Sequence, residues 1–112
     1  MSAPLLNRRL VLEAPQRVAD GAGGFATVWT PQGEVWAEVV AGTGREAATT
    51  GASLSRVIYR ITLRGAPVGA PSRPVADQRF REGTRVFKVI SVTERDPAAR
   101  FLVCQAEEET AA

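Results

Sequence analysis

The sequence predicts an all-β domain, a small β-barrel or sandwich of about six or seven short strands with two long loops. Apolar and polar residues alternate with a period of two in several short stretches, as they do in strands with one buried face. Segments rich in Gly, Pro, Asp and Ser separate these stretches and predict turns and loops. At 112 residues, the chain is expected to form a single domain with one core.

The clearest strand is Val57 to Arg64, which contains neither Pro nor Gly. Its β-branched and aromatic residues suit a pleated surface with neighbours on both sides, so we expect it at the centre of the sheet. One predicted face carries Val57, Tyr59, Ile61 and Leu63, and the other carries Ile58, Arg60, Thr62 and Arg64.

The N-terminal part is expected to contain a flexible arm and a first strand. Residues 1–7 form the arm, and Arg9 to Glu13 alternates with its leucines inward. Pro15 is predicted to end this strand. Asp20 to Gly24 predicts a turn made of residues that tolerate positive φ, and no helix follows it, so a phosphate-binding loop is not expected.

A hairpin is predicted next, with Phe25 to Thr30 and Glu34 to Val40 as strands and Pro31 to Gly33 as the tight turn between them. Trp36 lies between two acidic residues on the more polar face of the second strand. Two environments fit this residue: cover by a loop of the same subunit, or contact with a neighbouring subunit, where Trp is enriched.

Two long segments lack strand periodicity. Gly42 to Ser55 consists mostly of small and polar residues and is longer than most connections in compact domains, which favours a functional or a disordered loop. Gly65 to Asp77 contains three prolines and is predicted to be the second loop.

The C-terminal part predicts a short strand at Gln78 to Arg81 and a longer one at Arg85 to Thr93, joined by a turn at residues 82–84. The last strand is expected at Phe101 to Ala106. Residues 107–112 are expected to form a solvated acidic tail.

The residue types exclude several functions. Cys104 is the only cysteine and there is no histidine, which excludes an internal disulfide framework, a Cys/His metal site and a histidine-based catalytic dyad. Cys104 lies in an apolar run and is expected to be a buried thiol. No carboxylate pair has a recognisable catalytic setting, so neither enzymatic activity nor a cofactor is expected. No apolar run approaches the ~20 residues of a membrane span and no signal-peptide pattern is visible, so we expect a cytoplasmic protein without a membrane partner.

Charge is unevenly distributed along the chain. Residues 45–100 carry eleven basic and five acidic groups, whereas residues 101–112 carry three acidic groups only. A basic middle is compatible with contact to nucleic acid or to an acidic protein, but the formal net charge of +2 is far below that of a dedicated DNA-binding protein.

A series of short motifs runs along nearly the whole chain: Asp20, Gly23-Gly24, Trp29, Val35-Trp36-Ala37, Gly44-Arg45-Glu46, Tyr59 to Arg64, Arg79, Val86-Phe87-Lys88-Val89, Leu102 and Cys104. Together they resemble the head-tail joining family of tailed bacteriophages, which has relatives in prophages and gene transfer agents. Their order and spacing carry the resemblance. The stretch from Gly65 to Pro74 is longer than the family pattern leads us to expect.

The resemblance implies a small β-barrel that forms a six-fold or twelve-fold ring at the neck of a virion or phage-like particle. The implied partners are a portal or adaptor protein above, a tail terminator or tail tube protein below, and packaged double-stranded DNA held without sequence specificity. A loop closing the DNA channel would include Gly42, Gly44, Arg45, Glu46 and Gly51. The subunit interface would include Trp36, Arg60 and Arg64.

The composition of the implied channel loop suits that role. Its small residues allow several copies to crowd near an axis, and its glycines allow the loop to swing aside. Arg45 repeated around a ring would hold phosphate groups through charge-assisted hydrogen bonds, unless the adjacent Glu46 pairs with it. A surface loop that contacts the next ring is the alternative.

A second class of function stays open, a small monomeric β-barrel that binds nucleic acid or a peptide through the basic middle of the chain. Barrels that stack on bases display exposed aromatic residues among basic ones. Here the one Tyr and four Phe mostly occupy alternating apolar positions, which favours the connector.

Overall fold

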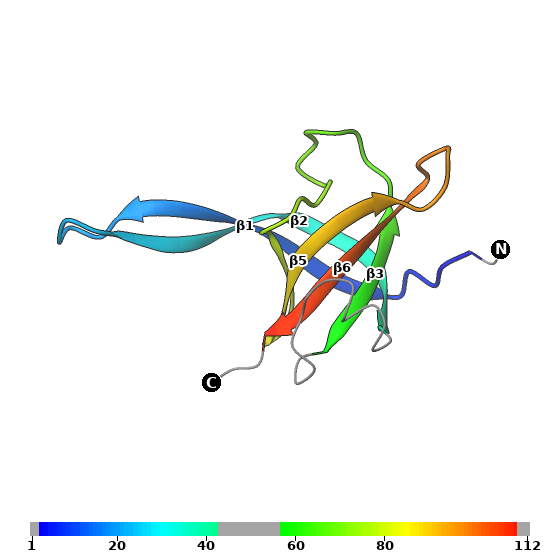
Figure 1. The fold of residues 1–112 in the computed structure, drawn as a ribbon, viewed down its shortest axis with the longest axis horizontal. Coiled ribbons are helices and arrows are strands. Elements are labelled where there is room, and N and C mark those ends of the chain that lie inside the picture. Colours follow the sequence, from blue (N-terminus) through cyan, green and yellow to red (C-terminus); the bar gives the residue numbers. More distant parts are fainter. Residues whose placement is uncertain (1–2, 43–56, 110–112) are drawn as a thin grey trace.

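The computed structural model describes residues 3–42 and 57–109, and these residues form six strands. The strands pair in the order β1-β2-β3-β6-β5-β4, every pair is antiparallel, and β4 pairs with β1 to close the barrel. The predicted all-β class is confirmed (Figure 1). The strands are β1 (Arg8–Ala19), β2 (Phe25–Ala41), β3 (Ile58–Arg64), β4 (Arg79–Glu82), β5 (Arg85–Glu94) and β6 (Phe101–Glu109).

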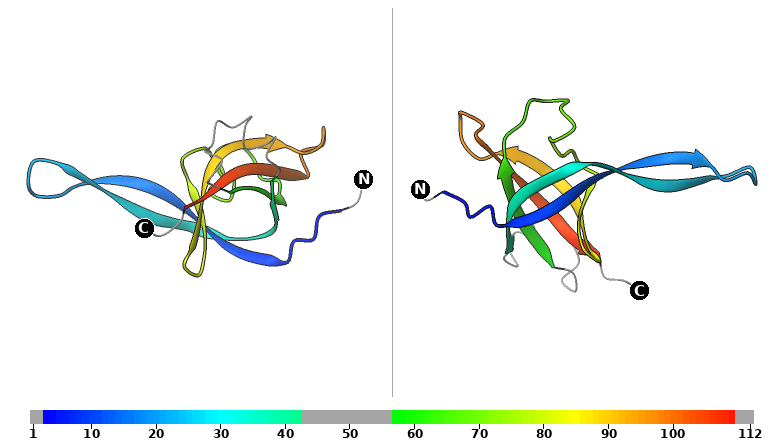
Figure 2. Two further views of the ribbon diagram at one scale, coloured as in Figure 1. Left: turned by 60° about the horizontal axis from the view of Figure 1, so that its bottom comes forward. Right: turned by 180° about the vertical axis from the view of Figure 1, so that it is seen from behind.

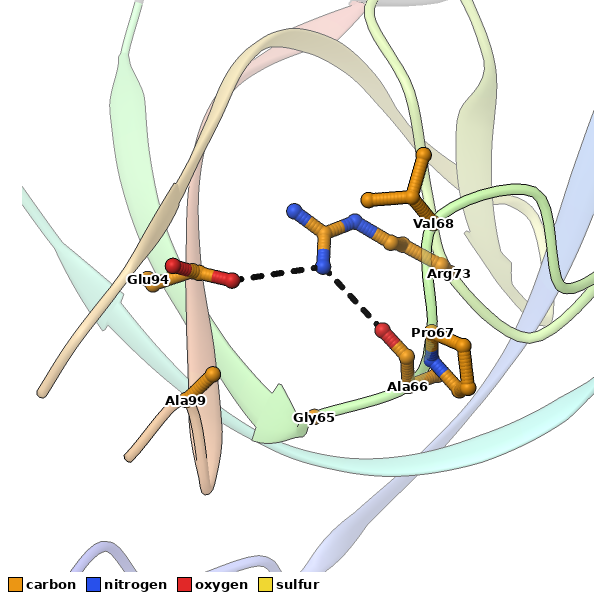
Figure 3. Close-up of a pocket in the computed structure, with 7 residues that line it drawn as sticks. All are labelled: Gly65, Ala66, Pro67, Val68, Arg73, Glu94 and Ala99. Atoms are coloured by element: carbon orange, nitrogen blue, oxygen red, sulfur yellow. Dashed lines mark hydrogen bonds and ion pairs between the residues drawn. The ribbon is translucent and has the colours of Figure 1, made fainter. Parts of the chain in front are cut away.

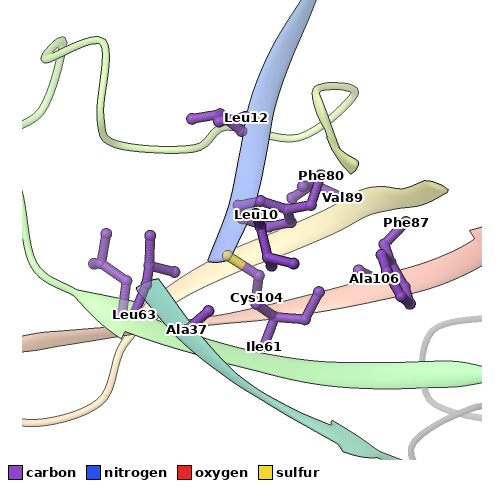
Figure 4. Close-up of a cluster of buried hydrophobic side chains, with 11 residues drawn as sticks. Leu10, Leu12, Ala37, Ile61, Leu63, Phe80, Phe87, Val89, Cys104 and Ala106 are labelled. Carbon is purple, nitrogen blue, oxygen red and sulfur yellow. The ribbon is translucent and has the colours of Figure 1, made fainter. Parts of the chain in front are cut away.

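The core lies inside the closed sheet, where all six strands contribute apolar side chains (Figure 4). Alternation explains which side chains point inward, because residues two apart on a strand share a face. Cys104 is fully buried, as predicted. The buried cluster is Leu10, Leu12, Ala37, Ile61, Leu63, Phe80, Phe87, Val89, Leu102, Cys104 and Ala106.

The strand predicted to be central has neighbours on both sides. β3 pairs with β2 through Ala37↔Leu63 and with β6 through Leu63↔Leu102, so the prediction is confirmed. Arg60 and Arg64 alternate with the buried residues of this strand and lie exposed on the outside of the barrel.

The prediction that Pro15 ends the first strand is wrong. β1 continues to Ala19, and Pro15 lies opposite Trp29 in the ladder with β2. Beyond Glu13 the other edge of β1 has no partner strand among the described residues, because β4 pairs only with Val11 to Glu13. Proline is tolerated on such an edge, since no ladder N–H is needed there.

The prediction of a hairpin turn at Pro31 to Gly33 is also wrong. β2 is one strand of 17 residues that runs through this segment. Gly33 lies opposite Leu12 and Pro31 opposite Glu13, so Gln32 is the extra residue of a β-bulge. The hairpin turn lies instead between β1 and β2, at Asp20 to Gly24.

The distal halves of β1 and β2 form a two-stranded arm that projects from the barrel along the long axis of the molecule (Figures 1 and 2). We define the arm as residues 14–30. Its ladder runs from Ala14↔Thr30 to Ala19↔Phe25, and no third strand pairs with it among the described residues. Because the arm projects, the molecule is elongated and measures 53 × 33 × 24 Å.

The loop predicted at Gly65 to Asp77 contains turns but neither strand nor helix. It is tied to the barrel at both ends: Gly65 N donates to Arg100 O (2.8 Å), and Asp77 N donates to Val89 O (3.0 Å). Within the loop, the side chain of Pro74 is fully buried. The loop is therefore an ordered part of the domain.

The prediction of an acidic tail from residue 107 is wrong for its first three residues. β6 extends to Glu109, where Glu107 lies opposite both Ile58 and Lys88. Glu108 accepts hydrogen bonds from Arg85, which supplies the charge that keeps these acids in the sheet. Residues 110–112 lie outside the described residues.

The predicted N-terminal arm is described from Ala3 to Asn7 and has no regular secondary structure. Leu5 N donates to a carboxylate oxygen of Glu38 (2.9 Å), which holds this segment beside β2. In residues 3–42 and 57–109 there is no helix long and apolar enough to cross a bilayer.

Candidate functional site

The residues predicted for a subunit interface lie on the outer surface of two adjacent strands. Trp36 belongs to β2, and Arg60 and Arg64 belong to β3. Trp36 is 56% exposed, so no loop within residues 3–42 and 57–109 covers it. The structure therefore leaves this side chain available to a partner.

Trp36 and Arg64 line a shallow pocket of about 220 Å³, which we call the Trp36 pocket. Its walls come from β2, from the end of β3 and from the beginning of the 65–77 loop. Arg64 is exposed and has no ion pair or hydrogen bond among the described residues. The lining residues are Val35, Trp36, Leu63, Arg64, Gly65, Ala66 and Ser72.

A second pocket, of about 350 Å³, lies beneath the same loop (Figure 3). Arg73 reaches into it, donates to Ala66 O (3.1 Å) and pairs with Glu94 (3.6 Å). A Cβ on Gly65 would lie 2.0 Å from Ala99 O, so only glycine permits the chain to pass here. These contacts give Arg73 a structural role in holding the loop.

The base of the arm is fixed by a buried carboxylate. Glu13 is only 5% exposed and accepts hydrogen bonds from Arg79 Nε (2.7 Å) and Arg81 Nε (3.0 Å). Burial alone would raise the pKa of Glu13, but the hydrogen bonds and charges of the two arginines outweigh it and lower the pKa. The Arg79 guanidinium also lies 4.2 Å from the ring centroid of Trp29, which links β4 to the arm.

The tip of the arm is a turn closed by Asp20. Its carboxylate accepts hydrogen bonds from Ala22 N (2.8 Å) and Gly24 N (3.1 Å), which lower the pKa of Asp20. Gly21 and Gly23 have positive φ, as the turn requires. The tip therefore carries an ionised carboxylate in a defined position.

Phe25 begins β2 directly after this turn and is 62% exposed. The guanidinium of Arg17 lies 4.3 Å from its ring centroid. Arg17 and Thr27 are opposite each other in the ladder, so Arg17 shares a face with Phe25 and Trp29. Val28 lies on the other face and is 46% exposed.

The barrel end that carries the beginning of β3 and the end of β6 is held by charged groups. Arg85 donates to Glu108 (2.8 and 3.2 Å) and to the hydroxyl of Tyr59 (3.3 Å). The Arg85 hydrogen bonds lower the pKa of Glu108, and the hydrogen bond from Arg8 lowers the pKa of Glu82. Tyr59 in turn packs edge-on against Phe87, with 5.2 Å between the ring centroids.

The predicted channel loop is described only at its two ends. Gly42 N donates to Ile58 O, so the intervening segment leaves and re-enters the barrel at one end, beside Tyr59. Gly44, Arg45, Glu46 and Gly51 lie outside the described residues.

This arrangement suits contact with other macromolecules. In the described part of the chain, no group of three or more His, Cys, Asp or Glu could hold a metal ion. Burial raises the pKa of the Cys104 thiol to about 12, which leaves it unreactive at neutral pH. The exposed features of the described residues include a projecting arm with an aromatic tip and a pocket with an aromatic wall.

Sequence reasoning missed the arm. Its signals were the turn at Asp20 to Gly24 and the matching lengths of chain on either side of it, but Pro15 and Pro31 were interpreted as strand ends. Phe25 is consequently predicted in a hairpin with Glu34 to Val40, whereas the structure places it at the tip of the arm, opposite Ala19.

Comparison with known proteins identifies relatives of the whole chain. Residues 1–109 match a family model described as phage head completion protein. A chain in the structure of the virion of a native gene transfer agent particle is 49% identical, with a TM-score of 0.78 over 98% of this chain and 100% of that chain. A solution structure of a Shigella flexneri 2a protein is 22% identical, with a TM-score of 0.72 over the full length of both, and shows the same fold. No curated protein sequence matches the chain.

Proposed function

The chain belongs to the phage head completion protein family, and from this membership we propose that it is a structural protein that joins head to tail in a phage-like particle. The observation that carries the proposal is the 49% identity, over the full length of that chain, to a component of a gene transfer agent virion. The protein would assemble in the cytoplasm and reside at the particle neck.

We further propose that it forms a six-fold or twelve-fold ring between a portal or adaptor protein and a tail terminator or tail tube protein. Two different exposed surfaces, the arm and the Trp36 pocket, support this proposal. Contacts between unlike surfaces of identical subunits are heterologous, and they produce rings when the rotation closes. Trp36, Arg60 and Arg64 would lie at or near the subunit boundary.

Closure of the DNA channel is assigned to the segment after Gly42, with Gly44, Arg45, Glu46 and Gly51 as its functional residues. The support is the family resemblance of these motifs and the position of the segment ends at one end of the barrel. Packaged double-stranded DNA would be held through its phosphates, without base recognition.

The alternative of a monomeric nucleic-acid-binding barrel has less support. Such a surface needs several aromatic side chains near one another, on which successive bases stack. Among the described residues the aromatic side chains with large exposure are Phe25 and Trp36, which lie on the arm tip and on the barrel.

Electron microscopy of particles made without this protein tests the role at the neck. Heads without tails are expected, and complementation with the parent chain should restore tailed particles. Normal tailed particles in its absence would overturn the proposed function.

Shortening the channel loop tests the finer assignment. Replacing Thr43 to Ala52 by two glycines should leave the barrel folded, because a shorter connection costs little chain entropy. Such particles should fill with DNA and then lose it before tails attach, measured as nuclease-protected DNA over time. Retention equal to that of the parent would overturn channel closure and leave the joining role intact.

A further inference from the structure

The two exposed aromatic side chains of the described residues belong to one continuous strand. Phe25 is at the start of β2 and Trp36 lies further along it, 62% and 56% exposed. At about 3.3 Å per residue, the extended backbone separates them by up to about 35 Å. They cannot meet within one subunit, but the tip of one subunit can reach the barrel of another.

The arm tip is organised as an anchor. Arg17 packs on the Phe25 ring and the Asp20 turn fixes the backbone beside it, so little side-chain freedom remains to be lost on binding. Pro15 lies on a strand of the arm and Pro31 directly follows the arm, and proline disfavours pairing with an additional strand. The arm is therefore suited to docking through its side chains.

The Trp36 pocket has the complementary chemistry. Val35, Leu63 and Ala66 give it apolar walls, and Trp36 supplies an aromatic one. Arg64 lines the pocket and has no ion pair among the described residues. Asp20 at the arm tip also has no ion pair within residues 3–42 and 57–109, and its negative charge is opposite to the positive charge of Arg64.

We propose that Phe25 of one subunit occupies the Trp36 pocket of the next subunit, with Asp20 facing Arg64. This inference rests on the ring of the proposed function and assigns its contact. The occupant is a second copy of this chain, because the charges and apolar surfaces of its own tip and pocket match. Since the tip and the pocket are different surfaces, the contact repeats head to tail around a ring. Aromatic side chains are enriched at such interfaces.

Disulfide crosslinking in assembled particles tests the contact directly. Ala22→Cys places a thiol at the arm tip without removing Phe25, and Ser72→Cys places one at the pocket. Cys104 does not compete, because it is buried. Particles carrying both substitutions should give, on oxidation, a ladder of crosslinked subunits up to the size of the ring.

Three control variants show whether a crosslink depends on both the arm tip and the Trp36 pocket. Either single substitution, or Ala22→Cys combined with Thr84→Cys in the β4–β5 turn, should give no ladder. A chain present in particles that gives no ladder, or crosslinks only to a different protein, would overturn this inference alone. Absence of the chain from purified particles would overturn the proposed function as well.

A mutant cycle provides a second measurement that does not depend on cysteine. Phe25→Ala and Trp36→Ala should each reduce the yield of tailed particles at least about tenfold, while each purified variant melts at the parent temperature. The double variant should be no worse than either single one, because both remove the same contact. Val68→Ala, at an 85% exposed position outside the Trp36 pocket, is the matched control. Additive losses in the double variant would count against a shared contact.

Discussion

Glu13 lies where β1 leaves the barrel, and it is the one charged side chain that is buried among the described residues. A buried carboxylate without partners would be strongly destabilising. Two arginines of β4 satisfy it, and one of them, Arg79, also packs on Trp29. These contacts set the direction in which the arm leaves the barrel.

Glu13→Gln is expected to lower the free energy of unfolding by about 1.5–3 kcal/mol at pH 7, since charged hydrogen bonds are lost. The pKa of Glu13 is lowered in the folded state, so its stabilising contribution is complete above the ordinary value of 4.5 and is lost as the pH falls through the folded-state pKa. Urea unfolding from pH 7 to pH 3 should therefore show the difference between parent and variant shrinking at the acidic end.

Glu34→Gln is the matched control for this series. Glu34 pairs with Arg9 at the surface, at 3.3 Å with both side chains more than half exposed. Its effect should stay below about 1 kcal/mol at every pH. A Glu13→Gln effect that is constant across the pH range would contradict the assignment.

Cys104 should be inert to thiol reagents in the native protein. With a pKa of about 12, only about one part in 10⁴ of the thiol is ionised at pH 8, and the residue has no exposed surface. Labelling by a maleimide should follow global unfolding and accelerate in urea. Rapid stoichiometric labelling without denaturant would show that the barrel opens locally at β6.

At the scale of the elements, the strands built on simple alternation were predicted well and the long ones were not. β3, β4 and β5 lie within a residue or two of their predicted bounds, because each has one apolar face against the core. The sequence predicted parts of β1 and β2 but not their full lengths. A two-stranded arm tolerates proline on its edges, and the bulge at Gln32 has the residue types of a turn. Glu107 and Glu108 belong to β6 because Lys88 lies opposite the first and Arg85 donates to the second. The local sequence around residue 107 does not show these two cations.

The candidate site was predictable in part, because alternation along a strand also decides which side chains point outward. Alternation placed Trp36, Arg60 and Arg64 on outer faces, and the structure brings them onto adjacent strands. The pairing of Arg17 with Phe25 depends on the register of an arm that was not predicted.

The arm should be removable without loss of the barrel. Replacing residues 16–28 by Asn-Gly joins Pro15 to its partner Trp29 through a two-residue hairpin turn. Because the arm contributes no residue to the buried core, the melting temperature should change by only a few degrees. Circular dichroism melting checks this outcome, and loss of cooperative unfolding would show that the arm stabilises the barrel.

At the scale of the whole molecule, the strands of the barrel pair with one another in a closed sheet. Contact with another copy would therefore be made by side chains and not by backbone pairing at a strand edge of the barrel. Closure through β1 and β4 spans only three residue pairs, and the 65–77 loop is tied to β5 next to it. A closed sheet has few edges for unwanted pairing. In the proposed ring, the exposed tip and pocket would be the places where contact with another copy is specified.

The isolated protein is expected to be monomeric or weakly associated at micromolar concentration. A stable interface buries at least about 1,000 Å² in total, and a slender arm tip in a shallow pocket offers less than that. Sedimentation velocity of the purified chain should give a monomer that associates further only with its neck partners. A stable ring in dilute solution would contradict this expectation.

The continuity of β2 from arm to barrel also has a mechanical consequence. If a neighbour pulls on the arm tip, the tension enters the barrel along the axis of β2, whose ladder bonds to β3 between Ala37 and Ala41 run across that axis. Bonds arranged across a pull resist it together in shear, whereas bonds in line with a pull open one after another. A neck built from such subunits would resist the outward pressure of packaged DNA through whole ladders at once.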